Sequence, residues 1–448
     1  PLKRRGFATF MVLWAVVLVA IVLGAIQVYA LRQSVDARRQ VARVRALWAA
    51  RAGVEAQVAA LTAATLSPDA QSPLTVQSDL EAAASGELQL ARYDIQHEVP
   101  TGRLPGPADA HAKININTAT REDLLLLPDM DESIADAILD WIDSDDDTRE
   151  FGAESGQYLG MRYPYLPRNA PFRSIQELEL VVGVRPEFVR GEDWNLNGVL
   201  DPNEDDGDAS WPPDNADGKL DAGWSGWLTA ESESGPGWAL SGQPRLDLTS
   251  ANETDLQNRL GVDASQAQAI LQAVQVNSQL TLKDFIGTSL GDLAVGATGG
   301  ASATLLSGQS AVADLTRDQL KALLDEAWIG DPGAPDDPAK VNTGKININT
   351  IDEDTLQYVS RLSTAQIDAL IVERQSRQGG FASLTDLLDV PSISQQTLAE
   401  LYDVFDVRSN TFVVSSRGID TGTGLQVEVV ATISRVRLPV EIRRLTVR

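Results

Sequence analysis

The sequence predicts an α+β protein with a long N-terminal transmembrane helix, a small antiparallel sheet and a large, mainly helical insertion. Three observations indicate this fold. Residues 7–30 are almost entirely apolar, the hexapeptide at residues 113–118 recurs unchanged at 345–350, and the C-terminal segment alternates between apolar and polar side chains. Each observation defines one part of the molecule.

The apolar stretch of residues 7–30 contains only Thr9 and Gln27 as clearly polar side chains. A bilayer core about 30 Å thick requires about 20 apolar residues, so this stretch can span it. A plain anchor and a cleaved secretory signal are the simpler interpretations, but the apolar region of a signal is usually about 7–15 residues long. A mostly helical apolar pattern continues beyond the span, and Pro68 is the first strong stop. We therefore expect one helix over residues 7–66.

Basic residues precede the apolar stretch, and no acidic residue occurs before Asp36. Short basic segments remain on the cytoplasmic side of a membrane, which sends the remainder of the chain across. The expected location is the inner membrane, crossed once, with the C-terminal bulk in the periplasm.

The chain of 448 residues has 37 basic and 63 acidic residues, a net charge of −26, and no cysteine. An acidic surface repels nucleic acid and attracts divalent cations. Without cysteine, disulfides, thiolate metal sites and cysteine nucleophiles are excluded.

The strands are expected at both ends of the region outside the membrane. Residues 87–95 alternate as a strand does, and residues 100–107 are rich in proline and glycine, which is typical of a linker. Residues 411–416, 425–433 and 436–447 indicate antiparallel strands joined by hairpins. We expect residues 67–112 and 409–448 to form one sheet, with everything between them inserted into it.

The insertion contains repeated modules. The hexapeptide Lys-Ile-Asn-Ile-Asn-Thr at residues 113–118 and 345–350 has a weaker copy at 245–250, and each copy precedes a helical pattern and then a phenylalanine-led segment. Identical repeats in matched context predict modules over residues 113–190, 245–330 and 345–408. Residues 287–309 and 331–344 have the composition of flexible connections.

These modules resemble the helix-hairpin-helix family, which often binds DNA. Such binding uses a Gly-hydrophobic-Gly hairpin that brings backbone N–H groups to a phosphate. The corresponding stretches at residues 128–131, 260–263 and 359–362 lack that pair of glycines, and two of them place aspartate near the expected phosphate. We therefore interpret the repeats as packing modules and do not expect a nucleic-acid partner.

The N-terminus resembles the type IV prepilin signal, with basic residues followed by Gly6-Phe7 and a long apolar helix. The resemblance implies a leader of residues 1–6 that a prepilin peptidase removes after Gly6. Most pilins carry a glutamate five residues into the mature chain, where this sequence has Met11. That departure implies a position where the carboxylate is not needed, such as the tip of a filament.

A second resemblance, to the K-class minor pseudopilins of type II secretion, covers roughly the first 190 residues. Its elements are Trp-x-Asp at residues 141–143, Gly-Ala-Glu at 152–154, Asn-x-Pro-Phe at 169–172 and Glu-Leu at 177–178. It implies a non-catalytic subunit that initiates or caps a periplasmic pseudopilus, with other minor pseudopilins as partners and calcium in the inserted domain. The alternative is a DNA-binding tip pilin of a DNA-uptake pilus.

The acidic insert, residues 191–230, carries a twelve-residue pattern typical of an EF-hand calcium loop. Oxygen side chains stand at positions 1, 3, 5, 9 and 12, a glycine allows the turn at position 6, and a carbonyl is the ligand at position 7. The predicted Ca²⁺ ligands are Asp193, Asn195, Asn197, Val199, Asp201 and Glu204.

Two further acidic segments are less complete. A half-loop follows with Asp214, Asn215, Asp217 and Asp221, but Trp224 stands where its twelfth residue should be. It is either a second calcium site or shares ions with the first. The other segment is a cluster that is either another calcium site or an acidic loop at a helix end, and it comprises Asp143, Asp145, Asp146, Asp147 and Glu154.

An enzymatic function is not expected. The two histidines, His97 and His111, are interpreted as incidental polar residues, and the sequence has no nucleophile elbow, phosphate loop or metalloprotease motif.

Overall fold

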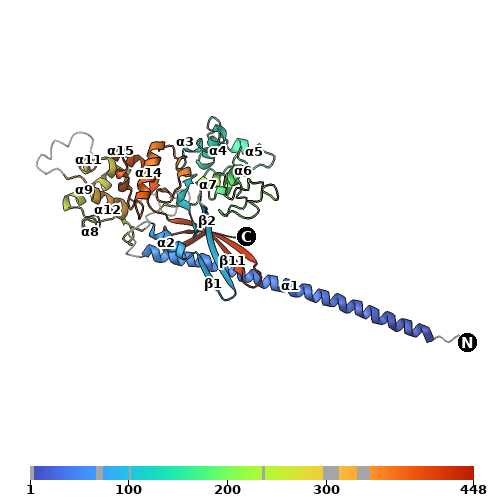
Figure 1. The fold of residues 1–448 in the computed structure, drawn as a ribbon. Coiled ribbons are helices and arrows are strands. Elements are labelled where there is room, and N and C mark those ends of the chain that lie inside the picture. The colour runs from blue at the N-terminus through green and yellow to red at the C-terminus, as the bar shows by residue number, and fades with distance from the viewer. Residues whose placement is uncertain (1–4, 67–73, 100–101, 235–237, 296–311, 330–343) are drawn as a thin grey trace.

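The computed structural model describes residues 5–66, 74–99, 102–234, 238–295, 312–329 and 344–448. Helix α1 (Arg5–Leu66) forms a long rod, and the rest of the chain forms a head at its C-terminal half (Figure 1). Among the described residues one helix is long and apolar enough to cross a membrane, and it is α1. The single helix expected from the sequence is confirmed.

The second half of α1 packs on a sheet through small residues. A Cβ atom on Gly418 of the sheet would lie 1.9 Å from the carbonyl oxygen of Ala46, and one on Gly53 of the helix would lie 2.3 Å from Ser416 Oγ. Neither position tolerates a side chain without separating the two elements. Behind these contacts, helix and sheet share a core that includes Val54, Leu61, Ile95, Val414 and Val429.

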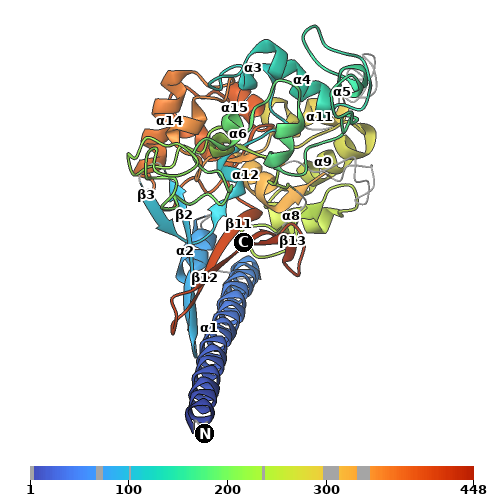
Figure 2. The ribbon, with the colours of Figure 1, turned by 90° about the vertical axis from the view of Figure 1, so that its right-hand side faces the viewer.

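The sheet is antiparallel and has seven strands in the order β1-β2-β11-β12-β13, with β3 paired to β2 and β4 paired to β11. Ile95 of β2 lies opposite Ser416 of β11, so strands from the two ends of the chain are neighbours, as predicted. The insertion leaves the sheet after β4 and returns at β11, and it lies at one end of the sheet (Figure 2). The strands are β1 Ser85–Leu88, β2 Ala91–Val99, β3 Gly102–Pro105, β4 Ala108–Asp109, β11 Thr411–Asp420, β12 Gln426–Ser434 and β13 Glu441–Val447.

Several expected boundaries were wrong. The single strand expected at residues 87–95 is a hairpin, because Leu88 pairs with Ala91 across a two-residue turn and the alternation continues through it. The expected linker at residues 100–107 contains β3, since Leu104 lies opposite His97 and even Pro105 lies in the strand, opposite Gln96. The flexible connection at residues 287–309 contains part of a helix, and its residues 296–309 lie outside the described part, as do residues 331–343 of the second connection.

Each module of the insertion is closed by a short parallel strand pair. The strand within each hexapeptide pairs with a later strand. β7 pairs with β8 and β9 with β10 at the ends of their own modules, whereas β5 pairs with β6 at the end of the acidic insert of residues 191–230. One continuous apolar core runs through all three modules. The strands are β5 Ile114–Asn115, β6 Leu228–Thr229, β7 Leu246–Asp247, β8 Ala327–Trp328, β9 Ile346–Asn347 and β10 Phe405–Asp406.

Short helices build the rest of the head. Several begin with a polar side chain that accepts a backbone N–H; Asp131, for example, accepts from Ile134 and starts α4. The helices are α2 Thr75–Ala82, η1 Ala110–Ala112, α3 Arg121–Leu124, α4 Glu132–Ile142, α5 Ser155–Leu159, η2 Ile175–Leu180, α6 Pro186–Arg190, α7 Trp224–Trp227, α8 Glu253–Leu260, α9 Ala264–Val276, α10 Asp284–Gly287, α11 Leu290–Val295, α12 Arg317–Glu326, α13 Glu353–Leu356, α14 Thr364–Ser376, η3 Leu384–Asp389 and α15 Gln395–Leu401.

The second asparagine of the hexapeptide has the same role in the two identical copies. Asn117 donates to the carbonyl of Phe172 and accepts from its N–H, at 3.0 and 2.6 Å. Asn349 makes the same pair of bonds with Phe381, at 3.0 and 2.7 Å. An amide side chain has the donor and acceptor that this bracket requires. The weaker middle copy has Thr249 at this position.

Candidate metal centre

A group of three carboxylates meets where α4 ends. Asp140 lies in the last turn of α4, Asp143 follows the helix, and Glu154 precedes α5. One oxygen from each lies within 4.8 Å of the others, an arrangement that could hold a metal ion. A Cβ atom on Gly152 would lie 1.9 Å from an oxygen of Asp140, so the backbone closes tightly over the group.

The group is short of partners for its negative charge. Arg149 pairs with Asp140 and Asp143, at 2.5 Å each. Glu154 is 2 % exposed, and neither of its carboxylate oxygens has a hydrogen-bond partner, nor does Asp143 Oδ1. Burial, then the neighbouring aspartates, raises the pKa of Glu154 to about 7. Three carboxylates whose oxygens lie within 4.8 Å of one another form a donor set that suits a hard divalent cation.

Only part of the acidic cluster predicted at residues 143–154 therefore belongs to this group of carboxylates. It brings Asp143 and Glu154 together and adds Asp140, which the sequence analysis missed although it lies one helical turn before Asp143. Two of the other aspartates accept hydrogen bonds within the connecting loop instead. Asp145 accepts from the N–H of Asp147, and Asp146 accepts from the N–H of Ser155.

The predicted calcium loop is folded as a closed turn between α6 and α7. Asp193 accepts from the N–H groups of Asn197 and Gly198, both at 2.9 Å, and Gly198 has a positive φ of 69°. Glu204 accepts from the N–H groups of Trp194 and Asp201, both at 3.1 Å, which joins the two ends of the loop. The six predicted residues thus belong to one loop, and Asp193, Asn197, Val199 and Glu204 are buried.

Several polar groups of this loop pair with one another. The side-chain nitrogens of Asn195 and Asn197 donate to Asp201 Oδ2, at 2.8 and 2.9 Å. Among the described residues, no three carboxylates of the loop converge as Asp140, Asp143 and Glu154 do. Burial raises the pKa of Asp193, and it raises that of Glu204 to about 7. The donor set is still rich in oxygen, so the loop also suits a hard cation once its amides turn their oxygens inward.

The second half-loop is held by a residue that the sequence analysis passed over. The buried carboxylate of Glu192 accepts from the N–H groups of Asn215 and Asp221, at 3.1 and 3.2 Å. Asp214 accepts from three backbone N–H groups, and Asn215 accepts from the N–H of Asp217. Because Glu192 directly precedes Asp193, the two loops are joined at their bases.

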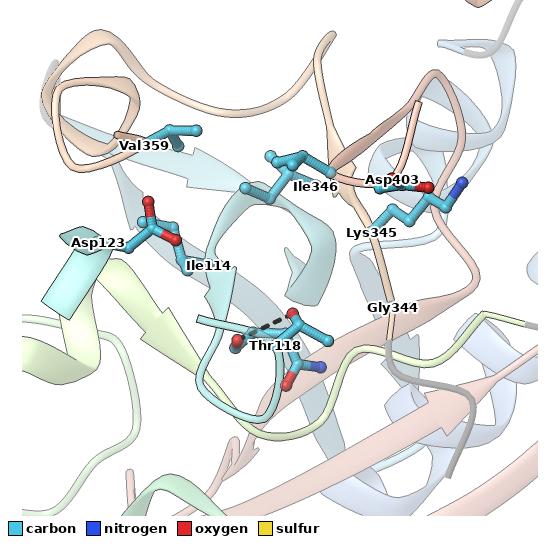
Figure 3. A pocket seen from close by; sticks show the side chains of 10 residues that line it. Ile114, Thr118, Asp123, Gly344, Lys345, Ile346, Val359 and Asp403 are labelled. Atoms are coloured by element: carbon cyan, nitrogen blue, oxygen red, sulfur yellow. Dashed lines mark hydrogen bonds between the residues drawn. The ribbon is translucent and has the colours of Figure 1, made fainter. Parts of the chain in front are cut away.

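A pocket of about 220 Å³ lies between the first and third modules (Figure 3). Figure 3 shows Ile114 and Asp123 on one side of it and Lys345 and Ile346 on the other. Its polar groups are already paired within the described chain. Asp123 accepts from the N–H of Ser360 at 2.8 Å, and Lys345 donates to the carbonyl of Tyr402 and lies over its ring. We interpret this pocket as a packing seam between modules.

Comparisons with known proteins support the resemblances stated above. Residues 110–191 match the family model described as type II secretion system protein K, and residues 341–405 match the helix-hairpin-helix motif. No curated protein sequence matches the chain.

Among solved structures, the chain is similar to one in the crystal structure of the GspK-GspI-GspJ complex from the enterotoxigenic Escherichia coli type 2 secretion system. The identity is 14 %, the match covers 92 % of this chain and 99 % of that chain, and the TM-score is 0.47. The family match includes Asp140, Asp143 and Glu154, so the carboxylate group lies within the matched domain. Residues 110–191 thus match the family that their sequence elements predicted, type II secretion system protein K.

Proposed function

We propose that this chain is a non-catalytic minor pseudopilin that initiates or caps the periplasmic pseudopilus of a type II secretion system. The observation that carries the proposal is the match of residues 110–191 to protein K, in a chain that also has the long apolar α1. The fold supports the assignment, because a small sheet packed on the second half of that helix carries the matched domain as an insertion.

Membrane insertion and processing form the first part of the proposal. Residues 7–30 cross the inner membrane, and a prepilin peptidase cleaves between Gly6 and Phe7. The intact mass of the protein purified from its native membrane tests this. A mature chain that keeps Arg5, or that begins beyond Ala30, would refute it.

A position at the tip follows from two features. Met11 stands where most pilins have the glutamate that pairs with a neighbouring subunit. The insertion is also far bulkier than the seven-stranded sheet, and a head of this size repeated along a filament would clash with the subunits above it. The missing glutamate and the bulky insertion are both tolerated at the tip, where no further subunit lies above. The decisive measurement is the number of copies in a purified pseudopilus. One or a few copies are expected, and numbers comparable to the major subunit would exclude the tip position.

The proposed partners are other minor pseudopilins, and the outer face of α1 offers them a contact surface. Val41, Val44 and Trp48 are exposed on the side of the helix that faces away from the sheet. Apolar side chains at such spacing are suited to packing against another helix. We expect Trp48→Glu to abolish co-purification of the partners. Val372→Glu, at an equally exposed apolar position on α14, is the matched control and should retain them.

Calcium is proposed to stabilise the insertion. Asp140, Asp143 and Glu154 would form one site, and the loop of residues 193–204 a second. Trp141 and Trp194 lie beside the two sites in sequence, so bound Tb³⁺ would give tryptophan-sensitised luminescence at each. Glu154→Gln and Glu204→Gln should each remove part of that signal. If neither variant lowers it, calcium binding at these residues is wrong.

The alternative is a DNA-binding tip pilin, which the motif match at residues 341–405 favours. One contact argues against it. The N–H of Ser360, in the hairpin that would approach a phosphate, donates to Asp123 of the first module. An internal carboxylate thus occupies the place of the phosphate, and the net charge of −26 adds repulsion. Fluorescence anisotropy with duplex DNA at low salt tests this, and salt-dependent binding would favour the alternative.

A further inference from the structure

The loop of residues 193–204 lies against the sheet, although the chain connects the two only through the distant ends of the insertion. Its backbone meets β2, where the N–H of Glu98 donates to the carbonyl of Gly198 at 3.1 Å and Glu98 Oε1 accepts from the N–H of Leu200 at 3.2 Å. Arg103 of β3 donates to the carbonyl of Leu200 at 2.7 Å. These bonds hold the turn of the loop against β2 and β3.

The predicted metal-binding side chains of the loop also contact the sheet. Arg417 of β11 pairs with Asp201 at 2.9 Å. The side-chain nitrogen of Asn197 lies 3.2 and 3.3 Å from the two carboxylate oxygens of Glu428 on β12. Arg448, beyond β13, donates to Asn195 Oδ1 at 3.1 Å. Three of the residues expected to bind calcium are therefore in contact with the part of the protein that packs on α1.

The insertion has a second lateral attachment to the sheet that does not involve the loop. Glu231 pairs with Arg444 at 2.5 Å and accepts from the hydroxyl of Thr432, and Glu233 pairs with Arg443 at 3.1 Å. This attachment follows the strand β6 that closes the first module. This attachment serves as a control for the loop, because it also consists of ion pairs but contains none of the predicted calcium ligands.

We propose that the loop of residues 193–204 is a calcium-dependent clasp that fixes the inserted domain on the sheet, with Arg417 and Glu428 as its sheet-side contacts. The proposal rests on the calcium assignment made above for this loop. A bound cation would offset the buried carboxylates of Asp193 and Glu204. The contacts with the sheet are made by the protein itself, because the closed turn presents the carbonyl of Gly198 and the N–H of Leu200 to Glu98.

Glu428 has a particular place in this clasp. It already faces Asn197, and it also accepts from the hydroxyl of Ser415 at 2.7 Å and lies 3.8 Å from Arg417. Its carboxylate can keep Asn197 and Arg417 oriented toward the loop, so we assign it as a positioning residue. Removing its charge should weaken docking of the insertion even when calcium is present.

The test measures the distance between the insertion and the sheet in the full chain. The protein has no cysteine, so Tyr163→Cys on the insertion and Arg92→Cys on β2, both at exposed positions, give two clean spin-label sites. In detergent micelles with calcium, we expect one narrow distance distribution. With a chelator, we expect a distribution that is at least twice as broad.

Variants in the labelled background separate the clasp from a general loss of fold. Glu428→Gln and Arg417→Gln should broaden the distribution even in calcium, whereas Arg444→Gln, at the other attachment, should leave the calcium response unchanged. An identical distance distribution with calcium and with chelator would overturn the clasp. If the same labelled protein, loaded with Tb³⁺, still shows terbium luminescence, the calcium assignment itself stands. Loss of the response in all three variants alike would also overturn the clasp.

Discussion

The two acidic regions of the insertion differ in whether their buried carboxylates have hydrogen-bond partners. In the loop of residues 193–204, each predicted carboxylate accepts hydrogen bonds from the loop, and Asn195 and Asn197 donate to Asp201. At the end of α4, Glu154 is equally buried but has no hydrogen-bond partner on either oxygen. The carboxylates of the loop thus have partners within it, whereas Arg149 pairs with Asp140 and Asp143 and leaves Glu154 unpaired.

The spacing of ligands in the sequence and the lack of partners in the structure therefore identify two different kinds of candidate site. A twelve-residue pattern identifies a loop that can wrap an ion, because its ligands are close in sequence. A buried carboxylate without partners identifies a place where the fold is incomplete without a cation or a proton. The largest dependence on calcium is therefore expected at Glu154.

Removal of calcium should have the largest effect. A ligand that binds the native state alone contributes about 2.7 kcal/mol per site when its free concentration is 100 times its Kd. Thermal unfolding of the full chain in detergent, with calcium and with chelator, measures this. We expect the melting temperature to fall clearly on chelation. Equal melting temperatures would contradict stabilising sites in both regions.

Glu154→Gln and Glu204→Gln should differ in sign when chelator is present. Glu154→Gln removes a buried charge without partners, so it should raise the free energy of unfolding by about 1–2 kcal/mol. Glu204→Gln replaces an acceptor of two backbone N–H groups by a side chain with one carbonyl oxygen, so it should lower it by about 1 kcal/mol. Chemical unfolding in chelator measures both. If both variants change the free energy of unfolding in the same direction, the distinction between the two regions is wrong.

The dependence of stability on pH should reveal the same buried carboxylates. Burial raises the pKa of Glu154 and of Glu204 from 4.5 to about 7 in the folded protein. The folded state then binds more protons than the unfolded state between these values, so in chelator the free energy of unfolding should fall as the pH rises from about 4.5 to about 7. Glu154→Gln should reduce this slope. A free energy of unfolding that rises over this range in chelator would contradict the proposed environment.

Much of the fold could be predicted because its signals are local or repeated. The apolar stretch before Asp36, the hexapeptide repeat and the alternation after Thr411 each specify an element without tertiary information. The errors arose where a pattern ran through a turn. The alternation from Glu87 to Ile95 continues across a two-residue turn between Leu88 and Ala91, so periodicity alone cannot separate one strand from two.

The candidate sites were predicted less completely, for a physical reason. Asp140 joins Asp143 and Glu154 only because α4 ends between the first two and the chain then returns at Gly152. Glu192 stands one residue before the predicted loop, and its bonds to Asn215 and Asp221 span more than twenty residues. When the chain must reverse direction to bring residues together, their spacing in the sequence is not fixed and a motif cannot predict them.

The smallest effect is expected at the half-loop of residues 214–221. Trp224 occupies the place of its missing twelfth residue, is buried, and donates from its ring nitrogen to the carbonyl of Pro128 at 2.8 Å. No bidentate carboxylate can reach the loop from that position. Asp217 is exposed and, within the described part of the chain, accepts only from the N–H of Lys219. Asp217→Asn should therefore change the free energy of unfolding by no more than about 0.5 kcal/mol.

The same variant tests whether this half-loop shares an ion with its neighbour. If Glu192 alone joins the two loops, Asp217→Asn should leave the terbium luminescence near Trp194 unchanged, while Glu204→Gln lowers it. A comparable loss in both variants would mean that the loops bind one ion together. The loop of residues 193–204 would then depend on ligands from outside its own twelve residues, as the group at α4 does, and the contrast between the two acidic regions would narrow.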